Sequence, residues 1–200
     1  MRDTNIFIFG DSITYGACDS EFGGWVNRLR ISLENNKDNI YYNTFNLGIS
    51  GEISEELVKR FNHEFLARYK ANTRTIIIFA IGINDTLDIN GKDLVKIEAF
   101  KNNILELIKQ AKHYTDEICF IGLTKIDERL MIPVSWDNER SYFNEKIIKF
   151  DNEIELICKD KKIKYIYMYD LLSVDELDDG LHPNSEGHKK MFERISNNMF

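Results

Sequence analysis

The sequence is poor in residues that interrupt or cross-link a chain. It has 200 residues but only two prolines, Pro133 and Pro183, and only three cysteines. Cys18, Cys119 and Cys158 form no C-x-x-C pair, so no zinc or redox motif is present in their spacing. An odd number of cysteines favours reduced thiols, which are typical of intracellular proteins. We therefore expect a cytoplasmic location.

Long apolar stretches are also missing. The longest apolar run covers 76–81 and extends to Ile83, far short of the ~20 residues that span a bilayer. The N-terminal segment contains only a brief apolar run at 6–9, whereas a signal peptide needs roughly 7–15 such residues. These features predict no stable insertion into a membrane.

Basic residues are in the minority. The chain has 26 Lys and Arg against 33 Asp and Glu, which gives a formal net charge of −7 and argues against nucleic acid as a partner. Hydrophobic residues make up 43% of the chain, which is ordinary for a globular protein. No linker or internal repeat interrupts the chain, so we expect one domain over residues 1–200.

Strand-like and helix-like segments alternate along the chain. The apolar patterns predict strands at 6–9, 41–47, 75–80, 117–122 and 164–169. Helices are expected at 24–35, after an N-cap at Ser50, after an N-cap at Asp93, at 137–161, and after an N-cap at Asn184. This order predicts an α/β fold, in which helices cover both faces of a parallel sheet.

Polar and glycine-rich segments follow several of these strands, at the sheet edge where α/β proteins bind ligands. Ser12, Asp179 and His182 supply a nucleophile, a carboxylate that orients a base, and the base itself. The Ser12 N–H, the Gly48 N–H and the Asn84 amide are candidate donors to an oxyanion. Together these groups can carry out acyl transfer.

These segments resemble the four sequence blocks of the GDSL-type, or SGNH, hydrolase family. The matching residues are Gly10-Asp11-Ser12, Gly48, Gly82-x-Asn84-Asp85 and Asp179-x-x-His182. The resemblance implies a three-layer, flavodoxin-like α/β/α fold whose five parallel strands have the order 2-1-3-4-5. It also implies that Ser12 is the nucleophile, that His182 is the base beside Asp179, and that Ser12, Gly48 and Asn84 form the oxyanion hole. Members of this family need neither a metal nor a cofactor.

Several assignments have alternatives. Asp178 competes with Asp179 as the carboxylate that orients His182, because both lie in one acidic run. We expect Asp11 and Asp85 to brace the site through hydrogen bonds to nearby backbone N–H groups. The remaining histidines lie in expected helices and are interpreted as structural or surface residues; they are His63, His113 and His188.

The substrate is less well defined by the sequence. The apolar segment 124–136 follows the fourth strand and is predicted to form a wall or lid of the pocket, with Met131 and Trp136 as contacts to substrate. Phe22 and Trp25 are further candidates for the pocket border.

We predict a serine esterase that acts through an acyl-enzyme and prefers short acyl chains. The alternatives are a carbohydrate O-acetyl esterase or a lysophospholipase or thioesterase of the same family. From another class, a non-catalytic flavodoxin-like binding module also has to be considered. The oligomeric state is left open.

Overall fold

A five-stranded parallel sheet forms the centre of the molecule, which is described by a computed structural model over residues 3–36 and 40–200. The strand order is β2-β1-β3-β6-β8. The strands are β1 (Thr4–Gly10), β2 (Tyr42–Gly48), β3 (Arg74–Ala80), β6 (Ile118–Ile121) and β8 (Lys164–Ile166). Counted along this sheet, the order is 2-1-3-4-5, as predicted.

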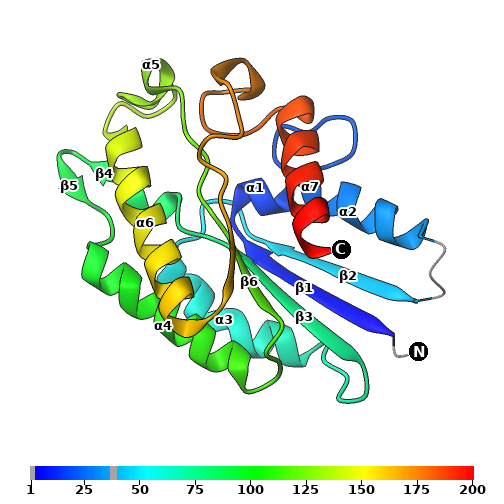
Figure 1. The fold of residues 1–200 in the computed structure, drawn as a ribbon. Coiled ribbons are helices and arrows are strands. Elements are labelled where there is room, and N and C mark those ends of the chain that lie inside the picture. Colours follow the sequence, from blue (N-terminus) through cyan, green and yellow to red (C-terminus); the bar gives the residue numbers. More distant parts are fainter. Residues whose placement is uncertain (1–2, 37–39) are drawn as a thin grey trace.

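Helices cover both faces of this sheet (Figure 1). One face carries α2 (Trp25–Glu34) and α7 (Ser185–Met199). The other carries α3 (Ser54–Leu66), α4 (Ile97–Lys112) and α6 (Asn144–Lys161). Short helices stand above the sheet or in its connections; they are α1 (Ser12–Tyr15), α5 (Glu128–Met131) and the 3₁₀ turns η1 (Asn84–Thr86) and η2 (Val174–Glu176). The predicted three-layer α/β/α architecture is therefore confirmed.

The core is rich in aromatic side chains between the central strands and α3. The ring of Phe9 lies 4.9 Å from that of Phe61, and the ring of Phe79 lies 5.5 Å from Phe61, measured between centroids. All residues of β1 are buried, because a central parallel strand is covered on both faces. This packing fixes the strand end that carries Ser12.

Of the three predicted N-caps, two are wrong and one is confirmed. α3 begins at Ser54 rather than after Ser50, and the side chain of Glu56 accepts the N–H of the N-cap residue Ile53. α4 begins after Lys96 rather than after Asp93, which is part of a short strand. Asn184 does cap α7, because its side-chain oxygen accepts the N–H groups of residues 186 and 187.

A second, antiparallel sheet was not predicted. Its strands are β4 (Asp88–Ile89), β5 (Lys92–Asp93) and β7 (Arg140–Ser141), in the order β5-β4-β7. The β4–β5 turn is Asn90-Gly91, where both residues have positive φ, 53° and 78°. β7 occupies chain that was assigned to the long helix at 137–161, so α6 is shorter than predicted and begins at Asn144.

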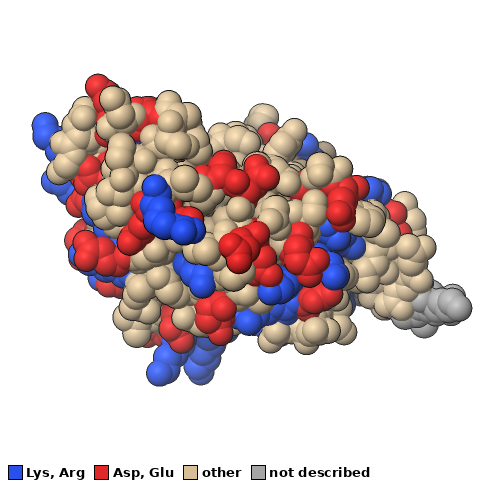
Figure 2. All heavy atoms as spheres, turned by 90° about the horizontal axis from the view of Figure 1, so that it is seen from above, with Lys and Arg blue, Asp and Glu red and all other residues tan. Residues whose placement is uncertain are grey.

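Charged side chains are spread over the surface. On the face shown in Figure 2, acidic and basic side chains are interspersed among uncharged ones. Among the residues that the structure describes, no helix is long and apolar enough to cross a membrane.

Candidate active site

Ser12 stands where the central strand β1 gives way to the one-turn helix α1. Asp11 caps this helix, because its carboxylate accepts the N–H of Ile13 at 3.0 Å. Gly16 ends the helix in the left-handed conformation, with φ of 103°. Ser12 is the first helical residue, and its N–H has no acceptor within the helix. The hydroxyl and this N–H are therefore held by a rigid turn at the carboxyl end of the sheet.

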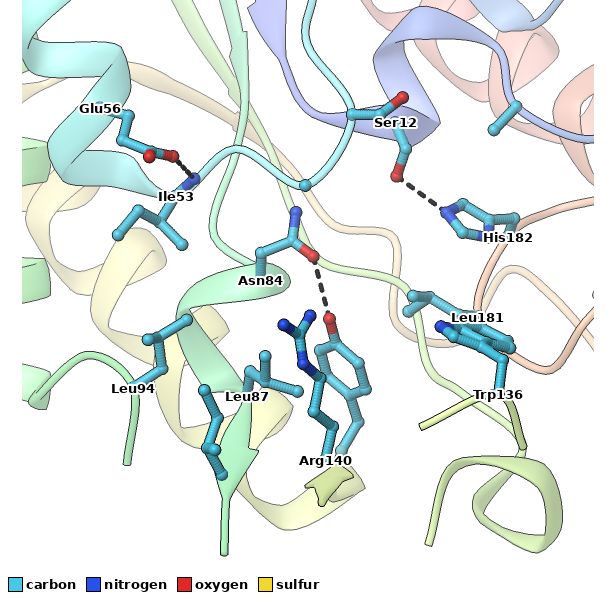
Figure 3. Close-up of a pocket in the computed structure, with 15 residues that line it drawn as sticks. Ser12, Ile53, Glu56, Asn84, Leu87, Leu94, Trp136, Arg140, Leu181 and His182 are labelled. Carbon is cyan, nitrogen blue, oxygen red and sulfur yellow. Dashed lines mark hydrogen bonds between the residues drawn. The ribbon is translucent and has the colours of Figure 1, made fainter. Parts of the chain in front are cut away.

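A chain of two hydrogen bonds links Ser12, His182 and Asp179. Ser12 Oγ lies 2.8 Å from His182 Nε2, and His182 Nδ1 lies 2.6 Å from Asp179 Oδ2. Figure 3 shows the serine and the imidazole facing one another across the pocket. With a proton on Nδ1, His182 presents the lone pair of Nε2 to the serine hydroxyl, which is the arrangement a general base requires.

Asp179, and not Asp178, contacts the imidazole. Asp179 Oδ1 also accepts the N–H groups of Leu181 and His182 at 2.9 and 2.8 Å. Partial burial opposes ionisation of this carboxyl, but the hydrogen bonds from His182 and Leu181 outweigh it and lower the pKa of Asp179 to about 2. Asp178 is exposed, and its carboxylate forms a hydrogen bond with the thiol of Cys18.

Both ends of the Asn84 amide are assigned by their partners. Asn84 Nδ2 donates to the carbonyl oxygen of Glu52 at 3.0 Å, while Asn84 Oδ1 accepts the hydroxyl of Tyr142 at 3.0 Å. Because an amide nitrogen carries two hydrogens, one remains for a ligand. Asn84 lines the same pocket as Ser12 and His182, so this hydrogen is available to an oxyanion there.

Gly48 is tightly enclosed and its N–H has a partner within the chain. A Cβ at this position would lie 2.3 Å from the backbone nitrogen of Tyr15 and 2.8 Å from the carbonyl oxygen of Asp11. A larger residue would therefore displace α1 and Ser12 with it. The Gly48 N–H donates to Asn46 Oδ1 at 3.1 Å, so donation to an oxyanion requires the Asn46 amide to release it.

Asp11 and Asp85 are buried, as braces of the site should be. Asp85 accepts the backbone N–H and the hydroxyl of Ser54, the first residue of α3. Burial raises the pKa of Asp11 to about 7, against the lowering effect of its bond to Ile13 and the proximity of His182. Burial likewise raises the pKa of Asp85 to about 7, in spite of its bonds to Ser54.

His188 is a buried structural residue. Its Nδ1 accepts the N–H of Trp25 at 3.2 Å, and its Nε2 lies 2.9 Å from the carbonyl oxygen of Ala17. Burial lowers the pKa of His188, which favours the neutral ring that this pair of contacts requires. The other two histidines are exposed, and they lie in or at the end of helices; they are His63 and His113.

The pocket has a volume of about 520 Å³ and opens beside Ser12, Asn84 and His182. It is lined by Ser12, Ala17, Ser50, Gly51, Ile53, Glu56, Asn84, Leu87, Ile89, Leu94, Trp136, Arg140, Tyr142, Leu181 and His182. Of the predicted substrate contacts, Trp136 lies at this pocket and is 57% exposed. Met131 is fully buried in the core instead, because α5 turns its side chain inward. Phe22 and Trp25 also lie outside the lining.

The small sheet supplies lining residues that were not singled out from the sequence, although the loop 83–91, which contains two of them, was expected to help build the pocket. Leu87, Ile89, Arg140 and Tyr142 come from β4, β7 and the residues next to these strands. The dipeptide Asn90-Gly91 was the available signal, since it is a strong indicator of a two-residue hairpin. The strands themselves are too short to give an alternating pattern.

Cys18 lies beside the hydrogen-bonded pair of Asp179 and His182. Within the described part of the sequence, one ligand atom each of Cys18, Asp179 and His182 lies within 4.8 Å of the others, which is close enough to surround a cation. Burial, together with the nearby carboxylates of Asp179 and Asp178, raises the pKa of the Cys18 thiol to about 11. Asp179 and His182 already form a hydrogen bond with one another, so a cation would compete with that bond.

Comparison with known proteins identifies the family. A model of the GDSL-like lipase/acylhydrolase family matches residues 8–190. The chain belongs to this family. Its members are ester hydrolases with a serine nucleophile, so the chain is a serine esterase, and the non-catalytic binding module considered from the sequence is set aside.

Solved structures of similar shape include esterases. A variant of an acetyl xylan esterase from Geobacillus stearothermophilus has a TM-score of 0.76 at 18% identity, covering 98% of this chain and 94% of that chain. An alpha/beta hydrolase from the metagenome of Lake Arreo, Spain, has a TM-score of 0.75 at 17% identity, covering 98% and 94%. At these identities the similarity extends to the fold alone. No curated protein matched the sequence.

Proposed function

We propose that this GDSL-like hydrolase cleaves small carboxylic esters with Ser12 as nucleophile, His182 as general base and Asp179 as the carboxylate that orients it. The observation that carries this proposal is the continuous chain from Ser12 Oγ to His182 Nε2 and from His182 Nδ1 to Asp179. Ser12 and His182 both line the pocket, so an ester bound there can contact the Ser12 hydroxyl.

In the first half-reaction, Ser12 Oγ attacks the ester carbonyl carbon while His182 Nε2 takes the hydroxyl proton. The negative charge that develops on the carbonyl oxygen is stabilised by the Ser12 N–H and the Asn84 amide, with the Gly48 N–H as a third donor when Asn46 releases it. Collapse of this intermediate breaks the bond to the alcohol, whose oxygen receives the proton from His182. The acyl group remains on Ser12.

In the second half-reaction, His182 removes a proton from water as the water oxygen attacks the acyl-enzyme. The tetrahedral intermediate uses the same oxyanion donors, and its collapse returns the proton to Ser12 Oγ and releases the acid. No step calls for a metal or cofactor.

The pocket favours short acyl chains, in the range of C2 to C6, over C12 or longer. It is a cleft of about 520 Å³ built from the small sheet and from segments beside it. A long chain would leave this wall after a few carbons and gain nothing further from burial. Lysophospholipid or long-chain thioester substrates are therefore less well accommodated.

A carbohydrate O-acetyl ester is a second candidate substrate, and two observations favour it. Trp136 presents an exposed ring at the pocket, on which a sugar ring can stack. Solved structures with this fold include an acetyl xylan esterase. We also propose a cytoplasmic location, which the three unpaired cysteines support, and no nucleic-acid partner, in keeping with the acidic net charge.

Labelling with a fluorophosphonate probe tests the nucleophile. The probe phosphonylates an activated serine, and intact-mass and peptide analysis should place one adduct on Ser12. Labelling should be lost in Ser12→Ala and strongly reduced in His182→Ala, with p-nitrophenyl acetate hydrolysis falling in parallel. An adduct on another residue, or full activity of Ser12→Ala, would refute the proposed mechanism. A panel of acyl esters, thioesters and acetylated sugars then ranks the substrate classes.

A further inference from the structure

We propose that one face of the small sheet β5-β4-β7 is the acyl-chain subsite of this esterase, and that the alcohol part of the ester lies on the opposite side of the pocket, against Trp136. The proposal rests on the function proposed above and adds the substrate class: esters of apolar acyl chains of about four to six carbons, in preference to acetyl esters. It makes Leu94 and Ile89 specificity-determining residues.

Strand register places the apolar residues of the small sheet together. Ile89 pairs with Arg140 across β4 and β7, and the N–H of Leu94 donates to the carbonyl oxygen of Leu87 at 2.9 Å. Because side chains alternate between the two faces of a strand, Leu87 and Ile89 lie on the same face. Leu94 and Arg140, which are opposite them, share that face, and all four line the pocket.

The other face of this sheet is polar and is attached to α6. Asp88 and Asp93 pair with one another across β4 and β5. Lys146 of α6 donates to Asp88 at 2.9 Å and to Asp93 at 2.6 Å. The sheet is thus fixed to the scaffold through its acidic face, which leaves the face that carries Leu87, Ile89, Leu94 and Arg140 directed at the pocket.

The position of His182 determines on which sides of the pocket the alcohol and the acyl chain of the ester lie. His182 must pass its proton to the alcohol oxygen, so the alcohol lies on the side of His182, where Trp136 and Leu181 stand (Figure 3). The carbonyl oxygen is directed to the donors at Ser12 and Asn84. The remaining substituent of the carbonyl carbon, the acyl chain, then points away from His182.

Aliphatic side chains occupy the direction left for that chain. In Figure 3, Leu94 and Ile53 lie on the far side of Asn84 from His182, and Leu87 lies below Asn84, beside Arg140. Leu87 follows Asn84 by only three residues through the turn η1, which fixes its distance from the oxyanion donors. Leu94 is 42% exposed, so a chain that reaches it covers apolar surface that is otherwise in contact with water.

An acetyl group would leave this face uncovered. Burial of one methylene is worth up to about a fourfold change in kcat/KM, from the free energy of transfer out of water. Butyrate and hexanoate esters reach successively further along Leu87, Ile89 and Leu94 in a pocket of about 520 Å³. Beyond Leu94 the surface continues into a neighbouring cleft whose lining includes the polar residues Lys96, Asn102 and Asn103, so the gain should stop near six carbons.

The test compares kcat/KM for p-nitrophenyl acetate, butyrate and hexanoate in the wild type and four variants. In the wild type, kcat/KM should rise from acetate to hexanoate by about tenfold or more. Leu94→Ser and Ile89→Thr should lower the hexanoate-to-acetate ratio severalfold. Trp136→Ala should lower kcat/KM for all three esters by one common factor, because they share their alcohol. Ile148→Ser is a matched control in α6, since Ile148 is 41% exposed and lies outside the pocket lining; its ratio should equal that of the wild type.

Two results would overturn the subsite assignment. One is a flat or falling profile from acetate to hexanoate in the wild type, which would favour an acetyl esterase. The other is a hexanoate-to-acetate ratio that Trp136→Ala lowers and Leu94→Ser does not. In both cases hydrolysis of acetate that depends on Ser12 would leave the proposed function standing, whereas loss of all Ser12-dependent hydrolysis would remove both.

Discussion

Tyr142 donates its hydroxyl hydrogen to Asn84 Oδ1 at 3.0 Å, and this bond, together with the bond from Asn84 Nδ2 to the carbonyl oxygen of Glu52, fixes which end of the Asn84 amide faces the pocket. Burial raises the pKa of Tyr142 well above its usual range, so the hydroxyl stays protonated and can donate its hydrogen to the amide oxygen. If the amide turned over, its nitrogen would face the tyrosine hydroxyl and its oxygen would face the backbone carbonyl of Glu52. Tyr142 therefore acts as a positioning residue for the proposed oxyanion donor.

We predict that Tyr142→Phe lowers kcat by about tenfold while KM changes little, because the amide loses its orientation but the pocket keeps its shape. Asn84→Ala should lower kcat by about 10²–10³, the usual effect of removing one oxyanion donor. Steady-state kinetics with p-nitrophenyl butyrate measures both. In the Asn84→Ala background, Tyr142→Phe should have almost no further effect.

A matched control is Tyr165→Phe, which removes another partly buried tyrosine hydroxyl, bonded to Asp151 at 2.7 Å and outside the pocket lining. It should reduce stability without changing kcat. Equal losses of kcat in the two tyrosine variants, or a rise in KM alone in Tyr142→Phe, would show that Tyr142 has no positioning role.

The two neighbouring carboxylates offer a second test. Asp179→Asn should lower kcat by up to about 10⁴, because an asparagine amide favours the wrong tautomer of His182. Asp178→Asn should change kcat less than threefold, since Asp178 does not contact the ring. The two variants have the same change of charge and lie side by side in the chain, so a general electrostatic effect would lower both rates equally. A larger loss in Asp178→Asn would reverse the assignment.

Stability should depend on pH through the buried carboxyl of Asp85. Its pKa of about 7 in the folded protein lies above the ordinary value of 3.8, so the folded state binds the proton more tightly than the unfolded state. The stabilisation from this proton is complete at low pH and is lost as the pH rises through about 7. At most, the loss is about 1.4 kcal/mol per pH unit.

The measurement is the free energy of unfolding of the wild type relative to Asp85→Asn, by urea denaturation at several values between pH 5 and 8. As pH rises through this range, the wild type should lose stability relative to the variant, whose amide does not titrate. The comparison removes the opposite contribution of His188, because that residue has a lowered pKa in both proteins. A difference that is constant with pH would show that Asp85 does not titrate in this range.

Metal ions should inhibit rather than activate. Dialysis against EDTA should leave esterase activity unchanged, because the proposed mechanism takes its nucleophile from Ser12 and its base from His182. Added Zn²⁺ should inhibit by bridging Cys18, Asp179 and His182, whose ligand atoms lie within 4.8 Å of one another. Cys18→Ser should weaken this inhibition about tenfold or more at constant pH, while activity without zinc is retained. Loss of activity on chelation that a divalent ion restores would contradict the prediction.

The sequence patterns were sufficient to locate the five strands of the parallel sheet, whereas the order of those strands was predicted from the resemblance to the GDSL-type family. The patterns were less informative about helix starts. Ser50 and Asp93 are good N-cap residue types, but α3 and α4 begin a few residues later. The Glu56 side chain accepts the N–H of Ile53 at the start of α3, and Asp93 pairs with Asp88 in the small sheet before α4 begins. Helix propensities and capping preferences describe short stretches of sequence and do not include such contacts with other parts of the chain.

The pocket was the least predictable part. Trp136 and Met131 were assigned to it together because both lie in one apolar segment. In the structure only Trp136 lies at the pocket, because α5 turns the side chain of Met131 into the core. Tyr142 could not have been singled out, because its role comes from Asn84, a partner 58 positions away in the chain.

Ser12 and His182 are separated by 170 positions along the chain, and the residue that ties α7 to the loop after α1, His188, comes later still. During synthesis the proposed nucleophile would therefore leave the ribosome long before the proposed base. A nascent chain folded only through β6 would contain four of the five strands of the parallel sheet and would still lack His182. If Ser12 and His182 act as proposed, ester hydrolysis would have to wait for the segment that carries His182.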